Sequence, residues 1–289
     1  MTETETAQTH RQSAPAPEAW SGASEPVFRD ILCAVAGTRA STAAVRLAAS
    51  LAGQGGHLTL LAVTAESGSG DYASAAISPS RVKRVLEHAE RIAEEAGVAS
   101  TTAVDPAGPP VKVILERATA HDLLAIGAPA TSWLAGMLVG GVAAAALSQF
   151  TTPMLVVRPS SGASLRGRRI LVASDGQEGS DRVVELAGRL GLSQGASVTL
   201  LHALGRESAA RPHRIQSQAK TLKLILGDAC EALVEPGAAT DVLLEVAKRS
   251  KAAMVVMGSR RLGGLRAIGS VSRRAVHEAP CSVLLLPPE

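Results

Sequence analysis

Apolar residues in the second half of the chain fall into short, almost unbroken runs separated by stretches with helical spacing. The runs show little alternation of apolar and polar positions, which is typical of strands buried on both faces of a parallel sheet. Strands are predicted over Arg169–Ser174, Ser197–Ala203, Cys230–Val234, Ala253–Met257 and Ser282–Leu286. Helices are predicted over Gln177–Leu190, Arg211–Leu226, Thr240–Ser250 and Ile268–His277. The regular alternation of strand and helix predicts an α/β fold.

The first half of the chain repeats this pattern in the same order. The matching segments are Ile31–Gly37 with Ile170–Gly176, Leu58–Val63 with Val198–Ala203, Leu123–Gly127 with Met254–Gly258, Gly140–Val142 with Gly269–Val271, and Met154–Val157 with Val283–Leu286. The repeat predicts two tandem doubly wound domains, each with a five-stranded parallel sheet and helices on both faces.

The repeat also sets the expected organisation of the chain. We expect a disordered tail over residues 1–26, a first domain over 27–159, a linker over 160–168 and a second domain over 169–289. The two domains are expected to pair within the chain as a pseudo-symmetric dimer whose last strands meet edge to edge, because this hides exposed strand edges. Whether two chains pair further is left open.

Composition narrows the class of function. The 289 residues include only five aromatic ones, which argues against base-stacking platforms for nucleic acid. Residues 161–289 carry eighteen basic and twelve acidic side chains, whereas residues 27–160 carry ten of each, so an anionic ligand is expected in the second half.

Three isolated cysteines, predicted to be small buried side chains, indicate a reducing compartment, and the N-terminus has no signal pattern. We therefore expect a cytoplasmic protein. The uncharged segment 123–157 is broken by proline and glycine, and its longest apolar stretch, Trp133–Leu147, is shorter than the roughly 20 residues of a membrane span. No membrane partner is expected.

In doubly wound sheets, ligands bind beyond the carboxyl ends of the strands. The first strand of the second half ends at Asp175, the fourth ends at Gly258, and Gly269 and Ser270 open the following helix. A helix N-terminus binds phosphate through free N–H groups and partial positive charge, and a carboxylate accepts hydrogen bonds from a ribose or a base amine. Together these features suit a mononucleotide. The candidate nucleotide-binding residues are Asp175, Ala203, Gly258, Ser259, Arg260, Arg261, Gly269, Ser270, Val271 and Ser272.

Each feature also has a purely structural interpretation. Gly269 and Ser270 can be an ordinary helix cap, Asp175 can be a turn residue before the next helix, and the arginines can form a solvated face. His202, at the end of the second strand, fits a hydrogen-bonded core histidine better than a ligand contact. Only the joint placement of these residues at predicted strand ends favours nucleotide binding over these alternatives.

Nearly all of the chain after residue 27 resembles the universal stress protein family in a tandem two-domain form. The segments that carry the resemblance are Ile170–Gly176, Val198–Leu201, Val255–Ser272 and Ala279–Val283. Nucleotide-binding members of this family carry the motif G-x2-G-x9-G-[ST] after the fourth strand and an aspartate that closes the first. The resemblance implies a stress-response or regulatory protein that binds ATP or AMP, with the presence of Mg²⁺ left open.

The second copy matches the family motif at Asp175, Gly258, Gly269 and Ser270. It departs at Arg261, which stands where the second glycine would be, and only seven residues separate Arg261 from Gly269. The shorter loop puts the fit of a triphosphate in doubt, although Arg261 can itself supply a charged contact to phosphate.

The first copy keeps the motif spacing and loses its chemistry. Ala36 replaces the strand-end aspartate, Ala130 the second glycine and Gly141 the serine. Its loop has no charge and holds Trp133, Leu134, Met137 and Leu138. We expect a degenerate domain whose apolar loop packs against its own vacated pocket, the second domain or another chain.

No catalytic constellation is evident in the sequence. It contains no G-x-S-x-G elbow, no G-x4-G-K-[ST] loop, no G-x-G-x-x-G fingerprint and no metal-type histidine spacing. No catalytic residue or metal ligand is therefore assigned, and slow ATP hydrolysis is the most that is expected. The main alternative is an interaction module that uses the same fold without nucleotide, with a protein partner still unknown. Nucleic-acid binding is disfavoured because no known motif accompanies the basic second half.

Overall fold

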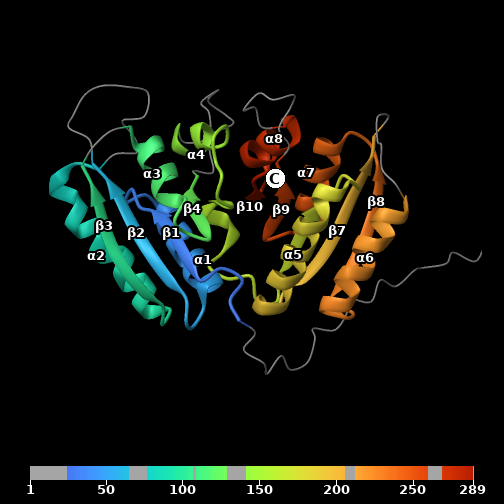
Figure 1. The fold of residues 1–289 in the computed structure, drawn as a ribbon, viewed down its shortest axis with the longest axis horizontal. Helices are drawn as coiled ribbons and strands as arrows, with labels where there is room; N and C mark the ends of the chain where they lie inside the picture. The colour runs from blue at the N-terminus through green and yellow to red at the C-terminus, as the bar shows by residue number, and fades with distance from the viewer. Residues whose placement is uncertain are drawn as a thin grey trace, which may run out of the picture.

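The computed structural model describes residues 25–64, 77–106, 109–128, 141–205, 212–259 and 269–288. Their strands form one ten-stranded sheet in the order β3-β2-β1-β4-β5-β10-β9-β6-β7-β8 (Figure 1). The strands are β1 (Asp30–Ala34), β2 (His57–Val63), β3 (Ala99–Asp105), β4 (Leu123–Gly127), β5 (Met154–Val157), β6 (Arg169–Ala173), β7 (Ser197–Leu204), β8 (Cys230–Pro236), β9 (Met254–Gly258) and β10 (Ser282–Leu286). The predicted α/β class is confirmed.

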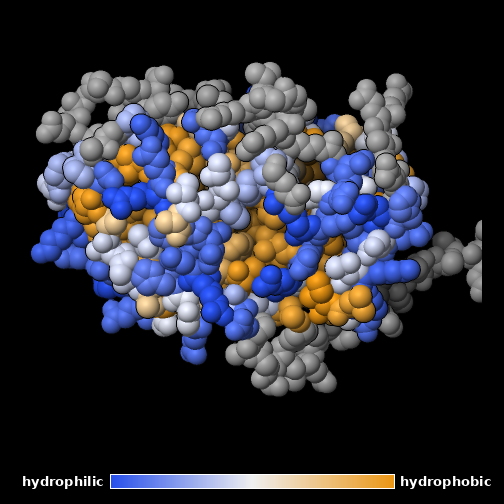
Figure 2. All heavy atoms as spheres, in the orientation of Figure 1, coloured by the Kyte–Doolittle hydropathy of each residue, from blue (hydrophilic) through white to orange (hydrophobic). Residues whose placement is uncertain are grey.

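Helices cover both faces of this sheet. They are α1 (Arg39–Ala52), α2 (Pro79–Glu95), α3 (Pro110–Ala118), α4 (Gly141–Ala146), α5 (Asp181–Gln194), α6 (Pro212–Leu226), α7 (Ala239–Arg249) and α8 (Ser270–Glu278). One apolar cluster joins α1, α2, α5 and α6 to one face, and a second joins α3, α4, α7 and α8 to the other. Both clusters run through the two halves of the chain, and hydrophobic residues are visible near the middle of the face drawn in Figure 2.

The two halves meet at their last strands. β5 and β10 pair antiparallel, with Leu155 opposite Leu284, whereas every other neighbouring pair in the sheet is parallel. Both leucines are fully buried. The expected edge-to-edge pairing within the chain is therefore confirmed, and each last strand has neighbours on both sides.

The outer strands differ from the expected pattern of continuous burial. β3 and β8 lie at the edges of the sheet and alternate exposed and partly buried positions, whereas β4, β5, β9 and β10 are buried almost throughout. Cys230 on β8 is accordingly half-exposed, so the prediction that all three cysteines are buried is wrong for this one. Cys33 and Cys281 are buried, and their burial raises the pKa of both thiols to about 12.

Several predicted features lie outside the described residues. These are the tail up to residue 24, the apolar loop around Trp133, and both Arg260 and Arg261. Within the described ranges, no helix has the length and apolar character needed to cross a bilayer.

Candidate functional site

The carboxyl ends of the central strands of the second half meet at one edge of the sheet, the upper edge in Figure 1. Ala173, the last residue of β6, lies opposite Leu201 of β7 and Met257 of β9. Asp175, which follows β6, and Gly258, the last residue of β9, therefore lie at the same end of the sheet, and Ser272 of α8 contacts Gly258 O. This is the edge at which doubly wound sheets bind their ligands.

Asp175 forms a tight turn at the end of β6. Its Oδ1 accepts hydrogen bonds from the Gln177 backbone N–H at 2.8 Å and from the Ser180 hydroxyl at 2.7 Å. Gly176 supports the turn with a φ of 71°, a value that glycine adopts readily. The turn role considered from the sequence is thus present, and it is compatible with a ligand contact because a carboxylate offers about four lone-pair sites.

Beneath this turn lies a buried polar network. The Gly176 N–H donates to Ser174 Oγ at 3.0 Å, and Ser174 Oγ donates to Gln218 Oε1 at 2.6 Å. Gln218 Nε2 then donates to Asp181 Oδ1 at 2.6 Å. His202 Nδ1 lies 2.9 Å from the Ser174 carbonyl oxygen and, since a carbonyl only accepts, carries the proton. The network joins β6, β7, α5 and α6 by hydrogen bonds beneath Asp175.

Gln218 is not among the residues predicted from the sequence, although its side chain is only 3% exposed. Its signal was its position on the apolar face of the predicted helix, three residues after Ile215 and four before Leu222, both of which are buried. A polar side chain at such a position requires a buried partner. His202, also 3% exposed, is the hydrogen-bonded core histidine that the sequence favoured.

The first half has the same backbone geometry at this edge without the polar groups. The Val35 N–H donates to Leu61 O at 2.9 Å, as the Ser174 N–H does to Leu201 O. Val35 thus takes the place of Ser174, and Ala36 takes that of Asp175. The first half instead begins α1 with a capping box between Thr38 and Ser41. Within the described ranges, this hydrogen-bonded network under the strand end is therefore found in the second half and not in the first.

The motif glycines of the two halves differ in how much space the surrounding residues leave for a side chain. A Cβ on Gly127 would lie 2.2 Å from the Ala40 carbonyl carbon, so the packing of α1 against β4 excludes any side chain there. At Gly258 the nearest atom would be Val183 Cγ2 at 3.3 Å, which is tight. Gly269 has a φ of −58°, and among the described residues no atom lies within 4 Å of an added Cβ. No packing contact of the described residues requires a glycine at position 269, although glycine is one of the residues favoured as an N-cap.

The N-terminus of α8 carries the remaining described candidates. Gly269 is the N-cap without a side-chain capping bond, and Ser270 is exposed. Val271 is half-buried, and Ser272 is buried with its hydroxyl donating to Gly258 O at 3.2 Å. The first N–H groups of a helix have no partner within it, so this end can accept an anion.

Two candidates line the strand ends. The Ser259 N–H donates to Leu286 O at 2.9 Å and its side chain is buried, while Ala203 on β7 is half-buried. Together with Asp175 and Gly258, both therefore lie at the carboxyl edge predicted for them.

Several basic residues of the second half are held in ion pairs. Arg214 Nη1 donates to Asp181 Oδ2 at 2.5 Å, and Arg274 binds Glu278 through two nitrogens at 2.9 and 3.0 Å. Lys223 likewise pairs with Asp228. Pairing of this kind leaves fewer cations to contact a nucleic-acid backbone. In the part of the chain that the structure covers, no group of three or more histidine, cysteine or acidic side chains is placed to hold a metal ion.

Comparisons with known proteins agree with this geometry. The family model described as the universal stress protein family matches twice, over residues 28–158 and 167–287. A universal stress protein of Thermus aquaticus is 29% identical over 136 residues, which are 41% of this chain and 98% of that protein.

Two solved structures have the same fold over most of the chain. A universal stress protein from Archaeoglobus fulgidus covers 90% of this chain and 98% of its own, with a TM-score of 0.74 and 19% identity. A protein of unknown function from Pseudomonas aeruginosa covers 90% of this chain and 93% of its own, with a TM-score of 0.63 and 18% identity. With two family matches that span most of its length, the chain belongs to the universal stress protein family and carries two of its domains in tandem.

Proposed function

We propose that this protein is a cytoplasmic stress-response protein that binds one adenine nucleotide, ATP or AMP, in its second domain, residues 169–289. The first domain, residues 27–159, is proposed not to bind nucleotide. The observation that carries this proposal is the start of α8, where the N-cap Gly269 has open space around an added Cβ among the described residues, at the same carboxyl edge of the sheet as Asp175. An unobstructed helix N-terminus and a carboxylate at one sheet edge suit the two ends of a nucleotide.

The proposed contacts follow from the chemistry of each group. The backbone N–H groups of Ser270 and Val271, with the Ser270 hydroxyl, bind phosphate, and Arg260 and Arg261 add positive charge. Asp175 accepts a hydrogen bond from a ribose hydroxyl or the base amine. The remaining candidates, Ala203, Gly258 and Ser259, line the site and are proposed to contact the nucleotide through its shape alone.

Ser272 has a different part in this proposal. Its hydroxyl hydrogen is already donated to Gly258 O, and a hydroxyl has only one hydrogen to donate. It therefore fixes the start of α8 against the end of β9 and does not donate to phosphate. No Mg²⁺ ligand, hydrolytic step or second chain forms part of the proposal.

Calorimetric titration with ATP and with AMP, each with and without Mg²⁺, tests the proposal. We expect one site per chain, weakened about tenfold or more by Asp175→Ala, as for the loss of a hydrogen bond to a charged group. Asp175→Asn separates the two roles of this residue, because an amide oxygen still accepts the turn bonds while the charge is lost. Asp228→Ala, which removes an exposed aspartate of the same domain, is the matched control and should leave binding unchanged.

The second candidate function is an interaction module that binds no nucleotide. It is favoured by one observation, that Asp175 already has a structural partner set in the turn. Absence of binding heat up to millimolar nucleotide, on folded protein shown to be free of carried-over nucleotide, would overturn our proposal in favour of this candidate.

A further inference from the structure

Arg158 is a buried arginine that crosses from the first half of the chain to the second. It directly follows β5 and is only 4% exposed. Its Nη2 donates to the carbonyl oxygens of Val276 and His277, each at 2.7 Å, and both belong to the last turn of α8. Its backbone N–H donates to Ser282 Oγ at 3.2 Å. One residue of the first domain thus holds the C-terminal end of a helix in the second.

The two carbonyls have a specific need for an outside donor. The N–H that would bond Val276 O within a helix is that of residue 280, which is proline and has none. The chain leaves the helix at Ala279, with φ −59° and ψ 139°, so the next N–H no longer points back at His277 O. The guanidinium of Arg158 supplies the missing donors, and its positive charge matches the negative end of the helix dipole.

Among the described residues, this clamp, formed by Arg158 on the Val276 and His277 carbonyls, has no equivalent in the other half. The pairing of Leu155 with Leu284 relates the two halves about the seam between β5 and β10. The same relation places Pro287 where the first half has Arg158, and proline offers neither a guanidinium nor an N–H. The first domain therefore holds α8 of the second domain, with no counterpart residue to hold α4 of the first.

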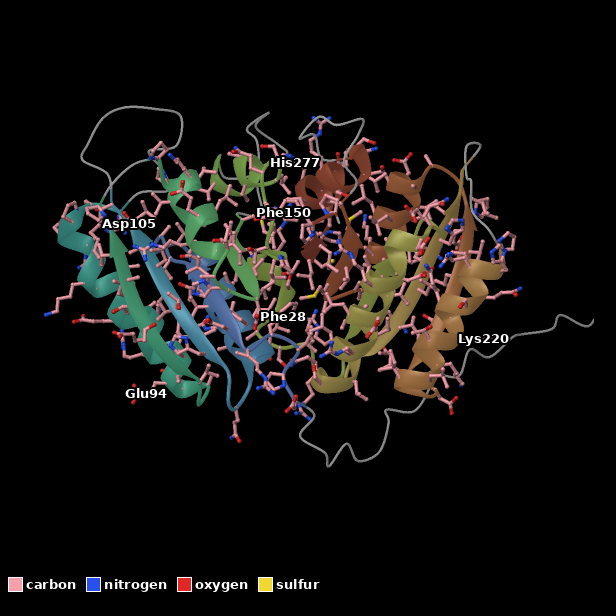
Figure 3. The ribbon with its side chains drawn as sticks, in the orientation of Figure 1. Phe28, Glu94, Asp105, Phe150, Lys220 and His277 are labelled. Carbon is pink, nitrogen blue, oxygen red and sulfur yellow. The ribbon has the colours of Figure 1, made fainter. Side chains whose placement is uncertain are left out.

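Besides the Arg158 contacts, α8 is held by the hydrogen bond from Ser272 Oγ to Gly258 O near its start and by that from Arg274 Nη1 to Asp241 Oδ1 of α7 at 3.2 Å. It is nine residues long, and only Ser272, Ala275 and Val276 are buried. Figure 3 labels His277 on this helix, near the middle of the molecule where the two halves meet. The end of α8 opposite the Arg158 clamp is the one that begins at Gly269 and Ser270.

We propose that Arg158 is a positioning residue for the phosphate-binding end of α8, so that nucleotide binding in the second domain depends on the first. This inference rests on the proposed function of the second domain. The first domain then acts as a support for its partner and needs no ligand of its own, which accounts for a domain that keeps its fold and lacks a polar site. Because coupling is reciprocal, bound nucleotide should in turn protect the clamped end of α8.

The test compares Arg158→Met and Arg158→Lys with the unaltered chain by amide hydrogen exchange and by titration with AMP. Methionine keeps an apolar stem of similar length and removes the donors, so exchange in the last turn of α8 should speed up about tenfold or more. AMP affinity should fall about fivefold or more, the lower range of measured couplings between sites. Lysine keeps the charge and should recover part of both effects.

Arg117→Met is the matched control. Arg117 lies in the last turn of α3 and pairs with Asp105 at the surface, so this variant should change neither α8 exchange nor AMP affinity. Loss of affinity in Arg158→Met, with partial recovery in Arg158→Lys, supports the inference. Unchanged affinity in a folded Arg158→Met protein whose α8 exchanges faster overturns it and leaves nucleotide binding standing. Absence of AMP binding by the unaltered chain overturns the proposed function as well. If Arg158→Met does not fold, unchanged AMP affinity in a folded Arg158→Lys protein overturns the inference by the same measurement.

Discussion

At the scale of single residues, the two motif glycines predict opposite outcomes for the same substitution. Gly127→Ala should destabilise the fold by about 1–3 kcal/mol or more, because the new Cβ would meet the Ala40 backbone at 2.2 Å. Gly269→Ala should stay within about 1 kcal/mol of the unaltered protein, since alanine reduces unfolded-state entropy and is a poorer N-cap. Urea denaturation measures both.

The same two variants should also differ in their affinity for AMP, measured by titration. A methyl group at position 269 would occupy space beside the start of α8 that no described residue fills, so on the proposed site Gly269→Ala should weaken AMP binding. Unchanged affinity would show that this end of the helix does not approach the phosphate. Gly127→Ala, once shown to be folded, should bind AMP as before, because it lies in the domain proposed to have no site.

Site residues could be predicted from the sequence where their position or their partners depend on neighbouring residues in the chain. Asp175 follows the end of β6, Gly258 ends β9 and Ser270 opens the next helix, so a pattern of strands and helices was enough to place them at one edge of the sheet. The partners of Asp175 were also near in sequence. Gln218 was missed because its hydrogen bonds reach Ser174 and Asp181, which are 44 and 37 residues away. Such a contact follows from how helices pack on a sheet, and periodicity alone does not give it.

At the scale of elements, the buried amide of Gln218 should be worth more than an exposed one on the same helix. Gln218→Leu leaves the buried Ser174 hydroxyl without its acceptor, and such a loss costs about 1–3 kcal/mol, whereas Asp181 is partly exposed and can bind water instead. Gln216→Leu changes an exposed glutamine of α6 and should stay within about 0.5 kcal/mol. Equal midpoints in urea for the two variants would contradict a stabilising network.

The C-terminal end of α8 should respond to pH through His277. Burial lowers the pKa of His277, and the charges of Arg273 and Arg158 lower it further, against a smaller opposite effect of Glu278. The unfolded chain then binds a proton more readily than the folded one, so stability falls as pH drops through the unfolded pKa of about 6.5. We expect the midpoint in urea to fall between pH 7.5 and pH 5 by more in the unaltered protein than in His277→Gln. A larger fall in the variant would reverse this assignment.

Element boundaries were predicted well where a strand is central and less well at the edge. The predicted strand Ser197–Ala203 is one residue shorter than β7, but Cys230–Val234 lacks the last two residues of β8. Those residues, Glu235 and Pro236, have low strand preference, yet they pair in register with Ala203 and Leu204 of β7. Pairing with the neighbouring strand β7 extends β8 to this boundary, and the local sequence pattern contains no information about that pairing.

At the scale of the whole molecule, continuous apolar clusters on both faces of one sheet predict that the two domains unfold together. Each cluster contains residues of both halves, and the seam between β5 and β10 is fully buried. Opening the halves would expose this surface and two strand edges at once. Scanning calorimetry should therefore show a single transition whose calorimetric and van't Hoff enthalpies agree. Two separate transitions would show that the tandem domains are energetically independent.

Substitutions at the seam between β5 and β10 test directly whether the two halves stabilise each other. Leu155→Ala and Leu284→Ala each remove a fully buried side chain and should each cost about 2–5 kcal/mol, while the exposed Leu224→Ala should cost less than about 0.5 kcal/mol. Because the two seam leucines face each other, the double variant should differ from the sum of the single ones by at least about 0.5 kcal/mol. Strict additivity would mean that the halves do not share this packing. A measured coupling would identify the seam as a place where the first domain stabilises the second. Leu155 lies on β5, the strand that Arg158 directly follows.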